Sequence, residues 1–291
     1  MQIRKCLFMI DLHVHSTVSD GTYTPAGLAE LAEKNGVEAF ALTDHESIAG
    51  NAEAAAAAKE LGIGFINGME MTMAYQGHKI HVVCLGFNPA HEGFQRLYKR
   101  LRYIKEDSMA DVVEIIRRKG IPIEFSTVKQ YAGGQLDRYA VMRALVAMDE
   151  FGNIQEIWDN YLNPAVKEAG VAWDIPAEEA LPVICEAGGV TSLAHFHKRI
   201  GLMGQNRAEQ EESIRELAGF GLCGMEACYP NYTAEDEAFA KAMIEKYRLL
   251  STGGTDFHGE NRPGVMLGTG INNNISAPME FLDNIRRSCH S

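Results

Sequence analysis

The sequence lacks the long apolar run that a membrane-spanning protein needs. Crossing a bilayer takes about 20 consecutive apolar residues, and the longest uninterrupted apolar stretches here are far shorter. The chain starts basic and then turns apolar, as a signal peptide does, but the apolar part is short and leads directly into Asp11, His13 and His15. We therefore expect neither a signal peptide nor a membrane association.

Basic residues are too few for broad electrostatic binding of nucleic acid. The chain has 27 Lys and Arg against 39 Asp and Glu, which gives a net charge of −12. Such a surface repels a phosphate backbone, so we expect no binding to duplex nucleic acid. A small phosphorylated substrate stays compatible with this charge, because bound divalent cations reverse the local sign.

Closely spaced cysteines are also missing. The six cysteines stand at positions 6, 84, 185, 223, 228 and 289, and no two have Cys-x-x-Cys spacing. This pattern disfavours both a disulfide framework and a thiolate zinc site. We therefore expect a protein of the reducing cytoplasm.

What the sequence does contain is an alternation of short apolar segments and amphipathic helical segments, which is typical of an α/β fold. Thr24 and Pro25 predict the start of a helix that ends at Gly36, and Ser47 predicts the cap of a second helix that ends near Gly62. Seven parallel strands are predicted, at residues 8–14, 37–43, 63–68, 79–86, 190–194, 222–228 and 248–252.

Seven such strands favour a barrel related to the (β/α)8 type, whose chemistry lies at the C-terminal ends of the strands. An open doubly wound sheet is the alternative, but no Gly-x-Gly-x-x-Gly loop follows the first strand. The alternation stops between residues 94 and 174, where long helical patterns cover 94–119, 137–148 and 154–168. We expect an inserted helical subdomain at 94–174 and a barrel made of 1–93 and 175–291.

The first strand carries the most informative pattern. Side chains alternate between the two faces of a strand, so Asp11, His13 and His15 point to the same side. A polar face exposed to solvent would show the same alternation. Further His, Asp or Glu residues stand at or near the ends of other predicted strands. These residues are Asp20, His45, Glu70, His81, His195, Asp256 and His258.

In a barrel these strand ends meet at one mouth, where so many imidazoles and carboxylates need cations to neutralise and orient them. Imidazole and carboxylate ligands without thiolate favour Zn, Mn or Fe. Nine candidate ligands are too many for one ion, so we expect two or three divalent transition metal ions. Sites with several metal ions hydrolyse phosphoesters by activating water and holding phosphoryl oxygens.

These residues, in this order, resemble the PHP (polymerase and histidinol phosphatase) family. The motifs are residues 11–16 (DLHVHS) with Asp20, 43–45 (TDH), 68–70 (GME), His81, 194–195 (AH) and 256–258 (DFH). The resemblance implies a distorted (β/α)7 TIM-like barrel with three metal ions and a metal-bridging hydroxide as nucleophile. It assigns His13, His15, Glu70 and Asp256 to one ion, Glu70, His81 and His195 to a second, and Asp20, His45 and His258 to a third.

The same resemblance implies that Asp11 and Asp44 orient imidazoles; hydrogen bonding at a turn or strand end is the alternative role. Some members of the family have histidine where this chain has Asp20. A carboxylate there gives the third site a harder set of donor atoms, which favours Mn or Fe over Zn.

Within the family the chain resembles the branch that acts on nucleotides. Those members remove phosphate from nucleoside 3′,5′-bisphosphates or trim short RNA from the 5′ end, and the helical insert would form a lid that helps to choose the substrate. Lys198 stands where that branch has a phosphate-binding arginine, with Arg199 next to it. Arg138 is a further candidate for a phosphate contact, or an ordinary charge on a helix surface.

Several alternatives remain open from the sequence. His197 replaces a glycine of the branch and is either a ligand or a loop histidine. Tyr229 and Tyr232 would stack on a base or pack beneath the lid. A histidinol-phosphate or sugar-phosphate phosphatase is the competing enzyme, and a non-catalytic metal-binding accessory module is the competing class. The sequence does not predict an oligomeric state.

Overall fold

The computed structural model describes residues 9–132, 136–171 and 174–289 of the 291-residue chain. The first residue of the first predicted strand and the cysteine at position 6 lie outside the described residues. Contacts between Cα atoms divide the chain into two compact units: Met1–Gln95 with Ile175–Ser291, and Arg96–Asp174. None of the helices in the described part of the chain is long and apolar enough to cross a membrane.

The first unit is built on one curved sheet with the strand order β8-β7-β6-β4-β3-β2-β1-β9, and β5 pairs with β3. The strands are β1 (Met9–Asp11), β2 (Val37–Leu42), β3 (Gly64–Tyr75), β4 (His78–Leu85), β5 (Ile175–Pro176), β6 (Val190–Leu193), β7 (Gly224–Cys228), β8 (Leu250–Gly253) and β9 (Ala277–Pro278). The seven predicted strands correspond to β1–β4 and β6–β8, whereas β5 and β9 are two-residue additions that the sequence did not predict.

The sheet curves until its two ends nearly meet. The segment after β8 runs beside the segment after β1, where the Asp256 amide donates to the His13 carbonyl (2.8 Å) and the His15 amide donates to the Phe257 carbonyl (2.9 Å). The amide of Leu12 also donates to the carbonyl of Gly253 (3.2 Å). The fold is therefore the expected α/β class, a distorted and nearly closed TIM-like barrel.

One strand runs against the expected direction. β4 is antiparallel to both of its neighbours, β3 and β6, so the prediction of seven parallel strands is wrong for the fourth. The third strand does not end at Gly68 but continues to Tyr75, and a two-residue turn at Gln76 and Gly77 leads into β4. Both turn residues have positive φ (46° and 77°), as the tight turns of β-hairpins require.

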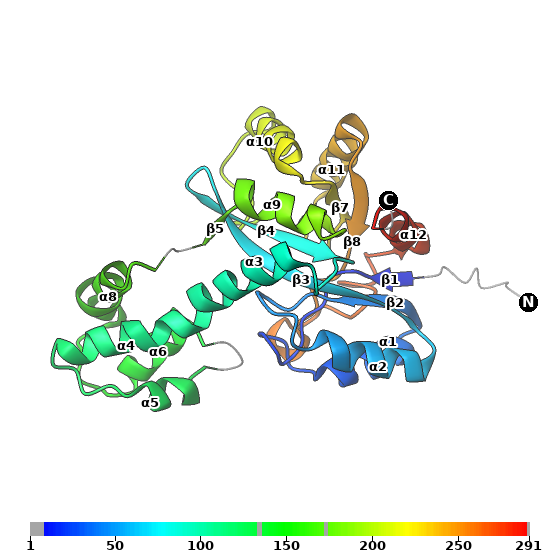
Figure 1. Ribbon diagram of the computed structural model, residues 1–291. Coiled ribbons are helices and arrows are strands. Elements are labelled where there is room, and N and C mark those ends of the chain that lie inside the picture. The colour runs from blue at the N-terminus through cyan, green and yellow to red at the C-terminus, as the bar shows by residue number, and fades with distance from the viewer. Residues whose placement is uncertain (1–8, 133–135, 172–173, 290–291) are drawn as a thin grey trace, which may run out of the picture. The chain divides into compact units, whose positions relative to one another are not determined.

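Helices cover the outside of the barrel. They are α1 (Pro25–Lys34), α2 (Asn51–Leu61), α9 (Ala177–Glu186), α10 (Arg207–Phe220), α11 (Ala234–Tyr247) and α12 (Met279–Ser288). A further helix, α3 (Glu92–Arg102), starts in the first unit and continues into the second. Figure 1 shows α1 and α2 side by side along β2. Thr24 caps α1 as expected, through a hydrogen bond from the Gly27 amide (3.0 Å). The cap predicted at Ser47 is wrong, since α2 starts only after Gly50.

The apolar core of the barrel lies beneath its mouth, and the polar side chains gather at the mouth itself. Ile10 and Leu12 from the first strand segment pack there against strand residues such as Val83 and Val190, and Leu282 and Ile285 of α12 complete the cluster. A second cluster joins α1 and α2 to the outer face of β2, with Phe40 at its centre. Together the two clusters fix the strands whose ends carry the candidate ligands.

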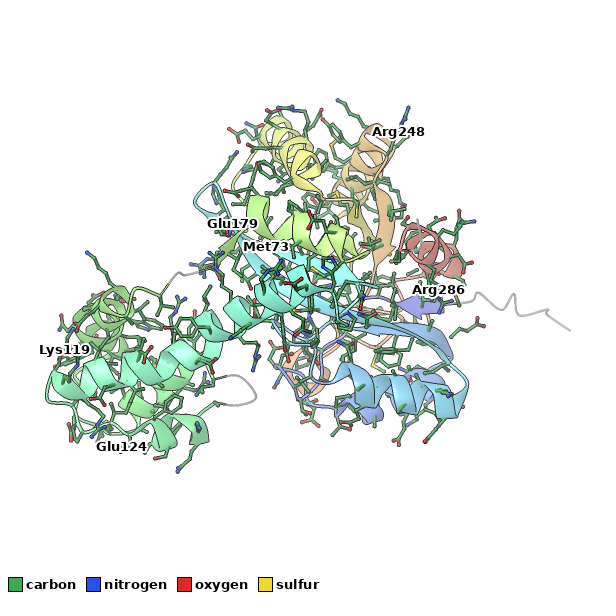
Figure 2. The ribbon with its side chains drawn as sticks, in the orientation of Figure 1. Met73, Lys119, Glu124, Glu179, Arg248 and Arg286 are labelled. Carbon is green, nitrogen blue, oxygen red and sulfur yellow. The ribbon has the colours of Figure 1, made fainter. Side chains whose placement is uncertain are left out.

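The second unit, which begins within α3, is helical throughout its described residues. Its further elements are η1 (Tyr103–Asp107), α4 (Ser108–Arg118), α5 (Phe125–Gln130), α6 (Arg138–Val146), α7 (Ile154–Glu156), η2 (Ile157–Leu162) and α8 (Asn163–Glu168). The π-helical turns η1 and η2 interrupt two of the helices expected from the sequence, and α5 was not predicted. Figure 2 labels Lys119 after α4 and Glu124 before α5, at the two ends of the loop between them. Met73, also labelled, lies on β3 and pairs with Ile175, the residue at which the chain returns to the barrel.

Candidate metal centre

His13 and His15 lie just beyond β1, in extended chain held by the segment after β8. β1 ends at Asp11, so the alternation predicted along a strand up to His15 does not continue as strand. Leu12 and Val14 pack into two different apolar clusters, while both imidazoles face Glu70 at the mouth of the barrel. Both histidines are buried. A solvent-exposed polar strand face is therefore excluded as the explanation of this motif.

Glu70 lies at the centre of the cluster and is fully buried. Its Oε2 atom is 3.2 Å from an imidazole nitrogen of each of three histidines: His13, His15 and His45. Its Oε1 atom is 2.9 Å from Nδ1 of His81 and 3.0 Å from Nε2 of His195. One carboxylate thus faces five imidazoles, which is the arrangement expected of a carboxylate that bridges two ions.

Two aspartates complete the cluster. Oδ1 of Asp256 is 3.5 Å from Nε2 of His13 and 3.3 Å from Nε2 of His15. Oδ1 of Asp20 is 3.3 Å from Nε2 of His258, and its Oδ2 is 3.6 Å from Nε2 of His45. Asp20 is the exposed member, with 49% of its side chain accessible to solvent. All nine candidate ligands therefore meet at one mouth.

Within the described residues, three groups place one ligand atom from each member close enough together to hold an ion. They are His13, His15, Glu70 and Asp256; then His45, Glu70 and His81; then His15, Asp20, His45 and His258. The first group has the membership that the family resemblance implied for one ion. The others differ in detail, because His45 stands in the middle group in place of His195 and His15 joins the third.

The elements explain how these residues come together. The antiparallel course of β4 brings His81, in the first half of that strand, to the mouth that the ends of parallel strands reach. Glu70 lies in the middle of β3 rather than after its end. His195 and Asp256 have positive φ values of 28° and 53°. A positive φ costs a non-glycine residue conformational free energy, and residues strained in this way are common at functional sites.

The chemistry of the donor set fits metal ions. Several deeply buried ring nitrogens and carboxylate oxygens have no hydrogen-bond partner among the described residues, although they face one another across the mouth. They are Nε2 of His13, both ring nitrogens of His15, Oε2 of Glu70 and Nδ1 of His195. Buried polar atoms are rarely left unpaired. Divalent ions would satisfy them, so the cluster fits divalent metal binding.

The electrostatics of the cluster favour the same conclusion. Burial raises the pKa of Glu70, but the surrounding imidazoles outweigh burial and hold that pKa well below its usual range. Burial lowers the pKa of His13, but the three carboxylates near it hold that pKa well above its usual range. The raised pKa favours a protonated His13, which compensates the nearby carboxylates, and His13 must release that proton in order to bind an ion.

Glu226 is a functional residue that the sequence analysis missed. It lies on β7 and is buried, its Oε1 is 2.8 Å from Nδ1 of His13, and its Oε2 accepts the backbone N–H of His195 (2.5 Å). It therefore fixes the ring orientation of one candidate ligand and the backbone of another. The available signal was a single glutamate inside an otherwise apolar strand.

Asp11 and Asp44 have a different role from the one expected. In the described part of the chain their carboxylates bind backbone and hydroxyl groups rather than imidazoles. Asp11 accepts the amide and the hydroxyl of Thr255 (2.9 and 2.5 Å), and Asp44 accepts the amide and the hydroxyl of Ser16 (both 2.7 Å). The expected contact with imidazoles is thus wrong, and both residues instead fix the loops that carry ligands.

A cavity of about 850 Å³ opens over the cluster, and Lys198 and Arg199 line it. Nζ of Lys198 is 3.2 Å from Oδ2 of Asp256, whereas Arg199 is exposed. Arg262, which the sequence analysis did not propose as a site residue, lines the same cavity. Arg138 begins α6 in the helical unit, where burial lowers its pKa, and its role as a phosphate contact stays a prediction.

The aromatic residues at the mouth pack instead of presenting open faces. Tyr229 is only 2% exposed, and its ring lies against those of His197 and Tyr232, so the hypothesis that Tyr229 stacks on a base is wrong. Packing of these residues beneath the lid stays a prediction. The half-buried ring of His197 lies against the rings of Phe196, Tyr229 and Tyr232, and burial lowers its pKa. His197 therefore belongs to this aromatic cluster.

Known proteins resemble the chain over most of its length. Residues 11–173 match the model of the PHP domain family. A 5′-3′ exoribonuclease of Haemophilus influenzae is 32% identical over 85% of this chain and 89% of its own. A 3′,5′-nucleoside bisphosphate phosphatase of Chromobacterium violaceum is 29% identical over 89% and 90%. A solved structure from Bifidobacterium adolescentis, classed as a metal-dependent phosphoesterase, superposes with a TM-score of 0.69 at 25% identity, covering 96% of both chains.

The chain therefore belongs to the PHP domain family, as the resemblance of its motifs predicted. It is a metal-dependent phosphoesterase and therefore a hydrolase. The cluster around Glu70 fits divalent metal binding.

Proposed function

We propose that this phosphoesterase acts on nucleotides, either as a nucleoside 3′,5′-bisphosphate phosphatase or as a 5′–3′ exonuclease on short RNA. The observation that carries the proposal is the convergence of nine ligand-type side chains beneath one cavity. Two relatives that match the chain over most of its length bear these activities in their names. The cavity volume lies within the range of small-molecule sites.

The proposed ligands are the nine residues grouped above, which would hold two or three divalent ions. When bound, such ions activate water as a nucleophile and hold the phosphoryl oxygens. We propose Mn, Fe or Zn, and the carboxylate of Asp20 favours Mn or Fe at the position that it shares with His45 and His258.

The chain's own residues prepare this chemistry. Glu226 keeps a proton on Nδ1 of His13, so that Nε2 is the atom offered to an ion. Asp11 and Asp44 hold the loops that carry Asp256 and His15. Within the described residues the ammonium group of Lys198 donates one hydrogen bond, to Asp256, and it can turn its other N–H groups toward a substrate phosphate as a point charge.

The rest of the proposal concerns the substrate. We propose a small phosphorylated molecule, not duplex nucleic acid, with Arg199 and Arg138 as further phosphate contacts. The insert at residues 94–174 would act as a lid that helps to select the substrate. We also propose that the protein works in the cytoplasm and does not associate with membranes.

The test is hydrolysis of a panel of substrates with added Mn, Fe, Zn or Mg. Adenosine 3′,5′-bisphosphate and short 5′-phosphorylated RNA represent the proposal, and histidinol phosphate represents the alternative phosphatase. We expect inorganic phosphate from the bisphosphate or nucleoside monophosphates from the RNA, with the activity lost in His13→Ala and kept in His78→Ala, since His78 is exposed on the β3–β4 hairpin. Preference for histidinol phosphate would favour the alternative enzyme, and no release from any nucleotide would reject the proposal in favour of an accessory module.

A further inference from the structure

The two oxygens of Asp256 face different surroundings. Oδ1 points to imidazoles: it lies 3.5 Å from His13, 3.3 Å from His15 and 3.5 Å from Nδ1 of His258. Oδ2 points away from them. A carboxylate rotates about its Cβ–Cγ bond, so the groups that bind Oδ2 decide which oxygen is offered to an ion.

Three donors from separate segments meet at Oδ2. The hydroxyl of Tyr229, just after β7, donates at 2.6 Å. Nη1 of Arg262, which follows the 3-10 helix η3 (Gly259–Asn261), lies at 2.7 Å. The ammonium of Lys198 donates at 3.2 Å. One oxygen with a hydroxyl and two cations around it is strongly held.

Arg262 holds Asp256 at two points. Besides its contact with Oδ2, Nη1 donates to the backbone carbonyls of Asp256 (2.8 Å) and Thr255 (3.1 Å). Nη2 donates to Oδ1 of Asn231 (2.8 Å), and the guanidinium lies 5.1 Å from the centre of the Tyr229 ring. The same residue therefore supports both the left-handed backbone of Asp256, at φ 53°, and its side chain.

Lys198 differs from the other two donors. Its side chain is 36% exposed, and the one hydrogen bond of its ammonium group leaves further N–H groups for a substrate. Tyr229, by contrast, is almost fully buried, and Nη1 and Nη2 of Arg262 together contact four oxygens. The fixed part of this arrangement is therefore Tyr229 with Arg262.

We propose that Tyr229 and Arg262 are positioning residues for Asp256: they hold Oδ2 so that Oδ1 faces the ion bound with His13 and His15. This inference rests on the proposed function, because it takes Asp256 as a ligand. Neither residue needs to touch the substrate. Replacing either residue should therefore lower the affinity for the ion directly, and should lower turnover only as a consequence of the lost ion.

The test is calorimetric titration of Mn²⁺ alone into chelator-stripped protein. Tyr229→Phe removes only the hydroxyl and keeps the ring, and Arg262→Gln removes the charge. We expect each to weaken the binding of one ion roughly 10- to 100-fold, as is usual when a partner of a ligand is removed. Because both act on one oxygen, the double variant should lose much less than the sum of the two losses.

Tyr247→Phe is the matched control, since its hydroxyl donates to Glu211 (3.0 Å) on another surface; it should bind Mn²⁺ within about twofold of wild type. Thermal unfolding of the stripped proteins checks the fold, and if one positioning variant fails to fold, the other decides the question.

Asp256→Asn separates this inference from the proposed function. If Asp256→Asn loses an ion while Tyr229→Phe and Arg262→Gln bind like wild type, the positioning role is wrong and the metal centre stands. If wild type binds no Mn²⁺, or Asp256→Asn binds as wild type does, Asp256 is no ligand, and both proposals are overturned.

Discussion

Replacing Glu226 by glutamine tests whether a buried carboxylate outside the ligand set controls the metal centre. Glutamine keeps the shape of the side chain but removes the charge and leaves only one accepting oxygen. The native carboxylate serves two donors, Nδ1–H of His13 and the backbone N–H of His195. In the variant one of these donors must face an NH₂ group, so one hydrogen bond is lost whichever way the amide turns.

The size of the effect follows from that single lost bond. A hydrogen bond to a charged, buried acceptor contributes about 1.5–3 kcal/mol. At about 1.4 kcal/mol per factor of ten, metal affinity should fall roughly 10- to 140-fold, which overlaps the range usual for such partners of a ligand. Turnover at limiting metal should fall by the same factor and recover in part when metal is in excess.

The assay combines calorimetric titration of Mn²⁺ with phosphate release at several metal concentrations. Glu237→Gln is the control, because Glu237 lies on α11 and pairs with Lys241 at the surface, where such a pair contributes little. If Glu226→Gln binds metal and releases phosphate within about threefold of wild type, losing the hydrogen bond costs under the 1.5 kcal/mol assumed, and the reasoning is refuted.

Three further predictions follow from the same site and from the thiols. Burial lowers the pKa of His15, but neighbouring carboxylates outweigh it and raise that pKa to about 10. Metal binding at pH 8 should therefore release protons and weaken as the pH falls. Calorimetric titrations in buffers of different ionisation enthalpy measure this release, and its absence would contradict the prediction. The neighbouring thiol of Cys185 and the Thr191 donors lower the pKa of Cys223 to about 6, whereas burial raises the pKa of Cys228 to about 12. Iodoacetamide at pH 7 should therefore label Cys223 faster than Cys228. Mass spectrometry measures the labelling, and equal rates would argue against the prediction. Lys198→Ala should raise KM about tenfold with little change in kcat, because a charge-assisted bond at a partly exposed site contributes on the order of 1.5 kcal/mol; an unchanged KM would exclude Lys198 from substrate binding.

The strands of the barrel were predictable because each is a short apolar segment bounded by turn residues. Their direction was not. Apolar composition carries no information on strand direction. The polar turn at Gln76 and Gly77 belongs to a long hairpin, and the first strand of this hairpin runs five residues beyond Glu70 before the turn begins. The continuation from Gly68 to Tyr75 contains Glu70 and Thr72, which look like the end of a strand. Their burial comes from the neighbouring elements.

The ligands were predictable because histidines and carboxylates recur where strands end. Their supporting residues were harder to find. Glu226 and Tyr229 are single polar groups in or after an apolar strand, and what distinguishes them is the partner that folding brings to each. The role of Arg262 likewise depends on its contacts with Asp256 and Asn231, which come from other segments. Asp11 and Asp44 were noticed, but their partners are backbone amides and hydroxyl groups that no sequence pattern identifies.

The most direct measurement of the central claim is phosphate release from adenosine 3′,5′-bisphosphate as metal is returned to chelator-stripped protein. The cluster around Glu70 predicts no release from the stripped protein, a rise as Mn²⁺ is added up to two or three equivalents, and a plateau beyond. Glu70→Gln should remain inactive at every loading. Stripped protein that releases phosphate as fast as metal-loaded protein, or a Glu70→Gln variant that keeps full activity, would contradict the account.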